Sequence, residues 1–125
     1  MHRHILVVDD DGDVRDVIVE MLTESGFVTT AAPGGVVMRD LIAAQGTPFD
    51  AIVLDCLMPG EASAELALHA KQMELPVVMI SGSPEMMQFA EDNGLQLLRK
   101  PFRLAELIEA VEAALASGKF GQRDA

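Results

Sequence analysis

The chain has 125 residues, half of them apolar, which is enough for one domain with a buried core and excludes a disordered chain. Twenty acidic residues against nine basic ones give a formal charge of −11, so we expect no binding to nucleic acid or to an anionic membrane surface. The single cysteine excludes an internal disulfide, and no apolar run is long enough to span a bilayer, so we expect a cytoplasmic protein.

The first half of the chain alternates strand patterns with helix patterns. Residues 5–8 (ILVV) are apolar throughout, which is typical of a strand buried on both faces of a parallel sheet. A helix ending near Gly26 is expected next, with one apolar stripe formed by Val14, Val17, Ile18, Met21 and Leu22. The elements that follow are a weaker strand at 27–31, a helix marked by Val37, Leu41 and Ala44, and an apolar strand at 51–54.

The second half continues the alternation. A helix marked by Leu66, Ala70 and Met73 cannot continue beyond Pro76, and an apolar strand follows at 77–80. The remaining elements are a short helix marked by Met86, Met87 and Ala90 that ends near Gly94, a strand at 95–98, and a helix with an apolar stripe of Leu104, Leu107, Ile108, Val111 and Leu115. We expect one domain over 1–116 and a polar C-terminal tail over 117–125.

Strict alternation of strands and helices predicts an α/β domain, in which right-handed crossovers place helices on both faces of an open parallel sheet. Ligands bind such sheets beyond the carboxyl ends of the strands, where the strand order reverses. Five polar side chains stand at the ends of four predicted strands and are expected to converge on that edge: Asp9, Asp10, Asp55, Ser81 and Lys100.

The chemistry of these five side chains is mutually consistent. Neighbouring carboxylates raise one another's pKa unless a cation neutralises them, and their oxygens suit a hard cation such as Mg²⁺. A lysine and a hydroxyl opposite such a metal complete a site for a phosphoryl group. We therefore expect Asp55 to act as a nucleophile, Lys100 to pair with one phosphoryl oxygen and Ser81 to hydrogen-bond another.

Four motifs occur in order along the chain: an acid pair in ILVVDDDGDVR, LD before MP, SG, and KPF. Their order and spacing resemble the receiver domain of bacterial two-component response regulators over nearly the whole chain. The resemblance implies a flavodoxin-like parallel sheet of five strands in the order 2-1-3-4-5, with five helices on its two faces.

The resemblance also implies a role for each site residue. Asp55 is the phospho-acceptor, Ser81 the switch hydroxyl and Lys100 the phosphate-binding lysine, joined to Pro101 by a cis peptide bond. The implied groups that hold Mg²⁺ are the carboxylates of Asp10 and Asp55, the backbone carbonyl of Leu57, and Asp9 acting through a water molecule.

A receiver of this kind takes a phosphoryl group from the phosphohistidine of a sensor histidine kinase and catalyses its own phosphorylation and dephosphorylation. We expect it to signal through protein contacts, to a downstream target or to a histidine phosphotransfer protein, as a monomer or as a phosphorylation-dependent dimer. Two alternatives stay open: a receiver excised from a hybrid sensor kinase or multidomain regulator, and a phosphate-independent interaction module with the same fold.

Two features depart from the receiver pattern. The loop at 58–63 (MPGEAS) lacks the usual Asp-Gly turn. Leu97 stands where an aromatic residue coupled to the switch hydroxyl is usual, and the segment at 94–100 is one residue short. The second feature excludes an aromatic switch at this place, and it resembles the receivers of hybrid sensor kinases.

The acidic cluster also fits the ligand spacing of a calcium-binding loop. Asp9, Asp11, Asp13 and Glu20 occupy positions 1, 3, 5 and 12 of an EF-hand. However, Val14 stands where that loop requires glycine, and a strand rather than a helix precedes it. We therefore expect Asp11 and Asp13 to start a helix, where carboxylates are favourable.

Overall fold

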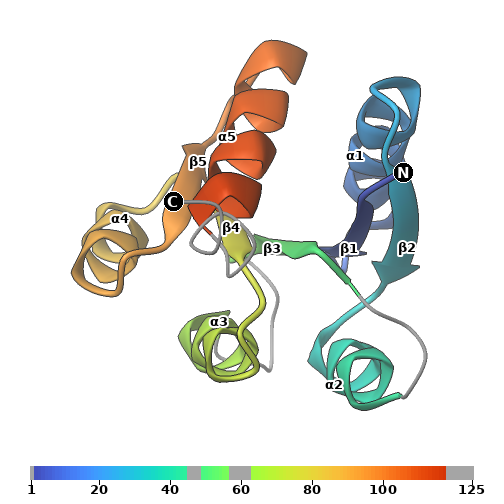
Figure 1. Cartoon of the computed structure of the whole chain (residues 1–125). Coiled ribbons are helices and arrows are strands. Elements are labelled where there is room, and N and C mark those ends of the chain that lie inside the picture. The colour runs from blue at the N-terminus through green and yellow to red at the C-terminus, as the bar shows by residue number, and fades with distance from the viewer. Residues whose placement is uncertain (1, 45–48, 57–62, 118–125) are drawn as a thin grey trace.

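The computed structural model describes residues 2–44, 49–56 and 63–117, which contain five strands alternating with five helices (Figure 1). The strands are β1 (His4–Val8), β2 (Val28–Ala32), β3 (Ala51–Asp55), β4 (Val77–Ser81) and β5 (Gln96–Arg99). The helices are α1 (Gly12–Glu24), α2 (Gly35–Ala43), α3 (Ser63–Gln72), α4 (Pro84–Asp92) and α5 (Leu104–Ser117). Each strand and helix expected from the sequence is present, with ends shifted by a few residues.

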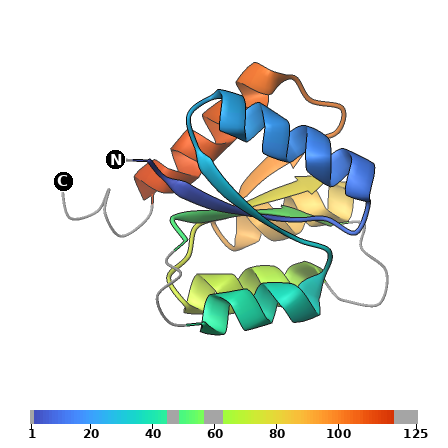
Figure 2. The ribbon, with the colours of Figure 1, turned by 90° about the vertical axis from the view of Figure 1, so that its right-hand side faces the viewer.

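The strands form one parallel sheet in the order β2-β1-β3-β4-β5, which confirms the predicted order. The order reverses between β1 and β3, since the chain leaves β1 for β2 on one side and then returns to β3 on the other. Helices α1 and α5 cover one face of the sheet, and α2, α3 and α4 cover the other (Figures 1 and 2). The fold is therefore the flavodoxin-like arrangement expected from the sequence.

The core consists of two apolar layers on either side of the sheet. Alternate residues of β1 enter different layers, so that Ile5 and Val7 pack towards α1 and α5 while Leu6 and Val8 pack towards α2, α3 and α4. The central strands β3 and β4 are buried along their whole length. Burial on both faces explains why these strands are apolar throughout.

The buried stripes of several helices differ from those expected. In α1, Ile18 and Leu22 are buried one turn apart, whereas Val17 is 49% exposed because it lies about 100° around the helix from Ile18. In α2 the buried side chain is Met38, and Val37 is 37% exposed. Three further residues expected on buried stripes are exposed: Ala44, Met73 and Leu104.

The described helices reach 14 residues in α5, and none combines the length and apolarity needed to cross a membrane. Helix α5 continues through Ser117. The rest of the expected polar tail lies outside the described residues.

Candidate functional site

The five predicted site residues stand at the carboxyl edge of the sheet. Asp9 and Asp10 follow β1, Asp55 and Ser81 are the last residues of β3 and β4, and Lys100 follows β5. Because these strands are parallel and adjacent, their ends lie at the same edge. The expected convergence from four strand ends is therefore present.

Three hydrogen bonds hold Asp9 in place, two at its backbone and one at its carboxylate. Its backbone N–H donates to the Ala32 carbonyl at 3.1 Å, and its backbone carbonyl accepts a hydrogen bond from Arg15 Nη1 at 2.7 Å. Its Oδ1 accepts from the backbone N–H of Asp11 at 2.9 Å. The other carboxyl oxygen, Oδ2, is buried and has no hydrogen-bond partner among the described residues. A buried oxygen of this kind is costly unless a cation or a water molecule completes its surroundings.

The neighbouring aspartates have a different role. The carboxylate of Asp11 accepts hydrogen bonds from the backbone N–H groups of Asp13 and Val14 and so caps the start of α1. Asp13 is exposed in the first turn of the helix. The expected helix start is confirmed, and a carboxylate that caps a helix is not arranged as an EF-hand ligand.

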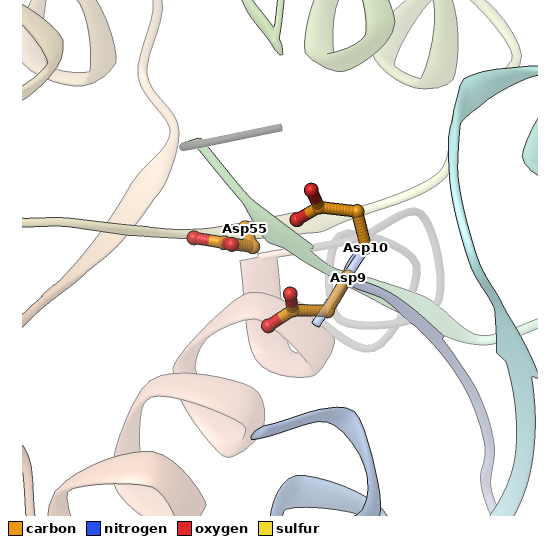
Figure 3. Close-up of side chains that lie close together, drawn as sticks. All are labelled: Asp9, Asp10 and Asp55. Carbon is orange, nitrogen blue, oxygen red and sulfur yellow. The ribbon is translucent and has the colours of Figure 1, made fainter. Parts of the chain in front are cut away.

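Asp9, Asp10 and Asp55 form the acidic cluster of the site. One carboxyl oxygen from each lies within 4.8 Å of the others, and the carboxyl groups turn to the same side in Figure 3. Asp9 and Asp55 are buried, whereas Asp10 is exposed. Burial, together with the nearby charge of Asp55, raises the pKa of Asp9 to about 6. The cluster therefore favours either a proton or a cation.

Lys100 provides the positive charge beside the acidic cluster. Its Nζ lies 3.1 Å from Asp55 Oδ1, with side-chain exposures of 31% for Lys100 and 5% for Asp55. The backbone N–H of Lys100 donates to the Ser81 carbonyl at 3.2 Å, which joins the ends of β4 and β5. The Lys100–Pro101 peptide bond is cis, as the resemblance implied.

Ser81 is fully buried at the end of β4, one residue beyond Ile80, which lies opposite Asp55 in the sheet. Its hydroxyl oxygen accepts a hydrogen bond from the backbone N–H of Ser83 at 2.9 Å. A hydroxyl that accepts a hydrogen bond still has a proton to donate. Ser81 is therefore oriented by its own loop and able to donate to an oxygen at the edge of the sheet.

Cys56 follows Asp55 directly but is not suited to nucleophilic chemistry. Its side chain is half-buried and packs against the core. Burial and the nearby charge of Asp55 raise the pKa of the thiol to about 11. Since the thiolate is the reactive form, Cys56 is unreactive near neutral pH and serves as a packing residue.

Two contacts at this edge were not foreseen in the sequence. The Ser63 hydroxyl donates to the backbone carbonyl of Asp55 at 3.5 Å, and the Arg15 guanidinium binds the backbone carbonyl of Asp9. The sequence feature that could have predicted the Arg15 contact is its position one helical turn after the cap residue Asp11. Leu57, expected to offer its carbonyl to the metal, lies outside the described residues.

The fold and site together define a class: a flavodoxin-like domain with an acidic cluster and a lysine where the strand order reverses. The family model for the response regulator receiver domain matches residues 5–112. The chain belongs to this family and is thus a phosphorylatable signalling domain of two-component systems.

Individual relatives agree with this assignment. Protein PetR of Rhodobacter capsulatus is 32% identical over 116 residues, covering 90% of this chain and 48% of PetR. The transcriptional regulatory protein PrrA of Mycobacterium tuberculosis is 39% identical over 117 residues, covering 89% of this chain and 49% of PrrA. The chain therefore spans about half the length of these relatives.

Solved structures show the same fold. A putative response regulator from Chloroflexus aurantiacus has a TM-score of 0.83 and 27% identity, covering 93% of this chain and 99% of that chain. The receiver domain of NtrX from Brucella abortus has a TM-score of 0.74 and 31% identity, covering 90% of this chain and 98% of that chain.

Proposed function

We propose that this receiver accepts a phosphoryl group onto Asp55 from the phosphohistidine of a sensor histidine kinase, with Mg²⁺ bound by the acidic cluster. The observation that carries the proposal is the surroundings of Asp55. Its buried carboxylate pairs with Lys100 at 3.1 Å and lies within 4.8 Å of two other carboxylates. A nucleophile between a cationic side chain and a group of oxygen ligands suits phosphoryl transfer.

The residues of the cluster fit Mg²⁺. They offer only carboxylate oxygens, the donors that a hard divalent cation prefers, and the buried Oδ2 of Asp9 needs a positive partner or a water molecule. Asp10 and Asp55 would be direct ligands, with Asp9 acting through water. When bound, Mg²⁺ would neutralise the carboxylates and the oxygens of an entering phosphoryl group.

In the proposed transfer, an oxygen of Asp55 attacks phosphorus in line. The bond from phosphorus to the imidazole nitrogen breaks, and its electron pair stays on that nitrogen. Lys100 pairs with one oxygen of the transferred group, and the Ser81 hydroxyl donates to another. Both side chains are positioned beforehand, Lys100 by its ion pair with Asp55 and Ser81 by the Ser83 N–H.

We propose that output passes through protein contacts, to a downstream target or a histidine phosphotransfer protein, from a monomer or a phosphorylation-dependent dimer. Ser81 and Lys100 contact phosphoryl oxygens only after phosphorylation, so their contacts favour a different arrangement of the face formed by α4, β5 and α5. Leu97 packs half-buried against the core layer that contains Ala90 of α4. An aromatic switch at position 97 therefore has no part in this change.

Phosphoryl incorporation from a small acyl phosphate tests the proposal. With Mg²⁺, the intact mass of the protein is expected to rise by one phosphoryl group, and a chelator is expected to prevent the rise. Asp55→Asn is expected to remain unmodified, while Asp40→Asn, a matched change at an exposed position of α2, is expected to behave like the wild type. Equal incorporation into Asp55→Asn would place the acceptor elsewhere.

The same experiment distinguishes phosphoryl transfer from the alternative function, a phosphate-independent interaction. A wild-type protein that neither binds Mg²⁺ nor incorporates phosphate would be a phosphate-independent interaction module. Transfer from a purified, phosphorylated histidine kinase, compared across the kinases of the source organism, then identifies the partner as the kinase that phosphorylates Asp55 fastest.

A further inference from the structure

The turn between β1 and α1 contains a closed ring of hydrogen bonds among Asp9, Asp11 and Arg15. The backbone N–H of Asp11 donates to Asp9 Oδ1 at 2.9 Å, and the backbone N–H of Arg15 donates to the Asp11 carbonyl at 2.9 Å. Arg15 Nη1 then donates to the Asp9 carbonyl at 2.7 Å, which closes the ring. Of the three bonds, this last one depends on a long side chain that reaches back over the turn.

The contact of Arg15 is with a peptide group and not with a carboxylate. Among the described residues, the ion pairs are formed by Arg3 with Asp50 and by Lys100 with Asp55, so Arg15 belongs to neither. The guanidinium lies close to Gly12, where an added Cβ would be 3.6 Å from Nη2. Arg15 is half-buried, and its guanidinium contacts the backbone of the turn.

The carbonyl that Arg15 binds belongs to the peptide group linking Asp9 to Asp10. The orientation of this peptide sets the direction of both side chains, one buried and one exposed. The side chain of Asp10 makes no hydrogen bond to the described residues, so its direction depends on the backbone. Mutation of a group that orients a metal ligand typically lowers metal affinity by about 10- to 100-fold.

We propose that Arg15 is a positioning residue that holds the turn so that Asp9 and Asp10 present their carboxylates to a divalent cation. The inference rests on the proposed function, because it concerns the affinity of the same acidic cluster for Mg²⁺. It adds a residue that contacts neither the cation nor the phosphoryl group.

The sign of the change in Mg²⁺ affinity tests this inference. Removing a positive charge near the cluster strengthens cation binding by electrostatics alone. If Arg15 positions the turn, Arg15→Met weakens Mg²⁺ binding in spite of the lost charge, by roughly tenfold. Arg15→Lys keeps the charge but replaces the planar guanidinium by a shorter ammonium group, so it is expected to weaken binding as well.

Titration calorimetry with Mg²⁺ alone measures the affinity, since the chain has no tryptophan or tyrosine to report binding. Arg39→Met is the matched control, because Arg39 lies in α2 on the other face of the sheet and its side chain has no hydrogen bond or ion pair to the described part of the chain. Far-UV circular dichroism of each variant shows that it is folded at the temperature of the titration.

Wild-type or tighter Mg²⁺ binding by folded Arg15→Met would overturn the inference. Wild-type binding by Arg15→Lys would overturn it as well, because it would show that the guanidinium contact with the Asp9 carbonyl does not set the Mg²⁺ affinity. If Arg15→Met does not fold, Arg15→Lys decides the question by itself. Absence of Mg²⁺ binding in the wild-type protein would instead refute the proposed function, so the two failures are distinguishable.

Discussion

Asp9 and Asp55 stand at the ends of the neighbouring strands β1 and β3 and are both almost fully buried, but their carboxylates have different partners. Asp55 pairs with Lys100 at 3.1 Å. Asp9 is held by backbone N–H and guanidinium groups that act on its backbone and on Oδ1, and its Oδ2 has no partner among the described residues. We call Asp55 with Lys100 the β3 half of the site, and Asp9 with Asp10 the β1 half. The β3 half contains a cationic side chain, whereas the carboxylates of the β1 half are placed to bind a cation.

This difference shows how one acidic cluster can serve both a metal and a nucleophile. Asp55 is the carboxylate proposed to attack, and its ion pair with Lys100 places a cationic side chain beside it. A buried carboxylate oxygen without a hydrogen-bond partner is costly until a proton, a metal ion or a water molecule completes its surroundings, and burial accordingly raises the pKa of Asp9. The two halves are therefore expected to respond differently to mutation, pH and Mg²⁺.

The largest effect is expected from Lys100→Met, which removes the cation of the β3 half. Loss of a positive group aimed at a transferring phosphoryl group typically lowers the rate by about 100- to 1000-fold. We expect that loss in the initial rate of phosphoryl incorporation into Asp55, measured by intact mass. Arg99→Met, the same change at the exposed neighbouring residue, is the control and should remain near the wild-type rate. A loss of less than about tenfold in Lys100→Met would contradict the role of this lysine.

The next effect concerns pH and the β1 half. In metal-free protein, folding raises the pKa of Asp9 from 3.8 to about 6, so between these values the native state holds a proton that the unfolded chain has lost. The stabilisation is complete below pH 3.8 and is lost as the pH rises through about 6. The free energy of unfolding should therefore fall across this window, by about 3 kcal/mol at most.

Urea unfolding of the wild type and of Asp9→Asn, in chelator and at several pH values, measures this change. The difference between the two proteins should depend on pH, because the asparagine cannot titrate. Saturating Mg²⁺ should stabilise the wild type near neutral pH and act much less on Asp9→Asn. Asp13→Asn removes an exposed charge from the same turn and should show neither effect. A difference that is constant from pH 4 to pH 7 would show that Asp9 is not protonated in the native state.

The smallest effect separates the metal-site carboxylates from the helix cap. Asp11→Ala removes the side chain that accepts from Asp13 N–H and Val14 N–H, and is expected to cost about 1 kcal/mol of stability. It keeps the backbone N–H that binds Asp9 Oδ1, so Mg²⁺ affinity should stay within about twofold of that of Asp16→Ala, a matched change at an exposed position of α1. A loss of Mg²⁺ binding as large as that of Asp9→Asn would make Asp11 part of the metal site.

Much of the fold could be predicted because its signals are local. The apolar runs of β1, β3 and β4 and the strict alternation with helical repeats indicated a parallel α/β domain, and the sheet order followed from the family resemblance. Asp11 was also recognisable as a helix start, because a cap acts on residues two and three positions away. The helix stripes were predicted less well, since small errors in phase exchange buried residues for exposed ones, as with Val37 and Met38.

The sequence by itself determined which chemical groups end each strand, because strand ends and motifs are short patterns along the chain. Only the tertiary structure decided how these groups divide their partners: Lys100 pairs with Asp55 across 45 residues, and Asp9 retains a buried oxygen with no partner among the described residues. The Arg15 contact with the Asp9 carbonyl also depends on the turn as it is folded. These features arise from burial and from the register of neighbouring strands, which bring distant residues together and remove water from them.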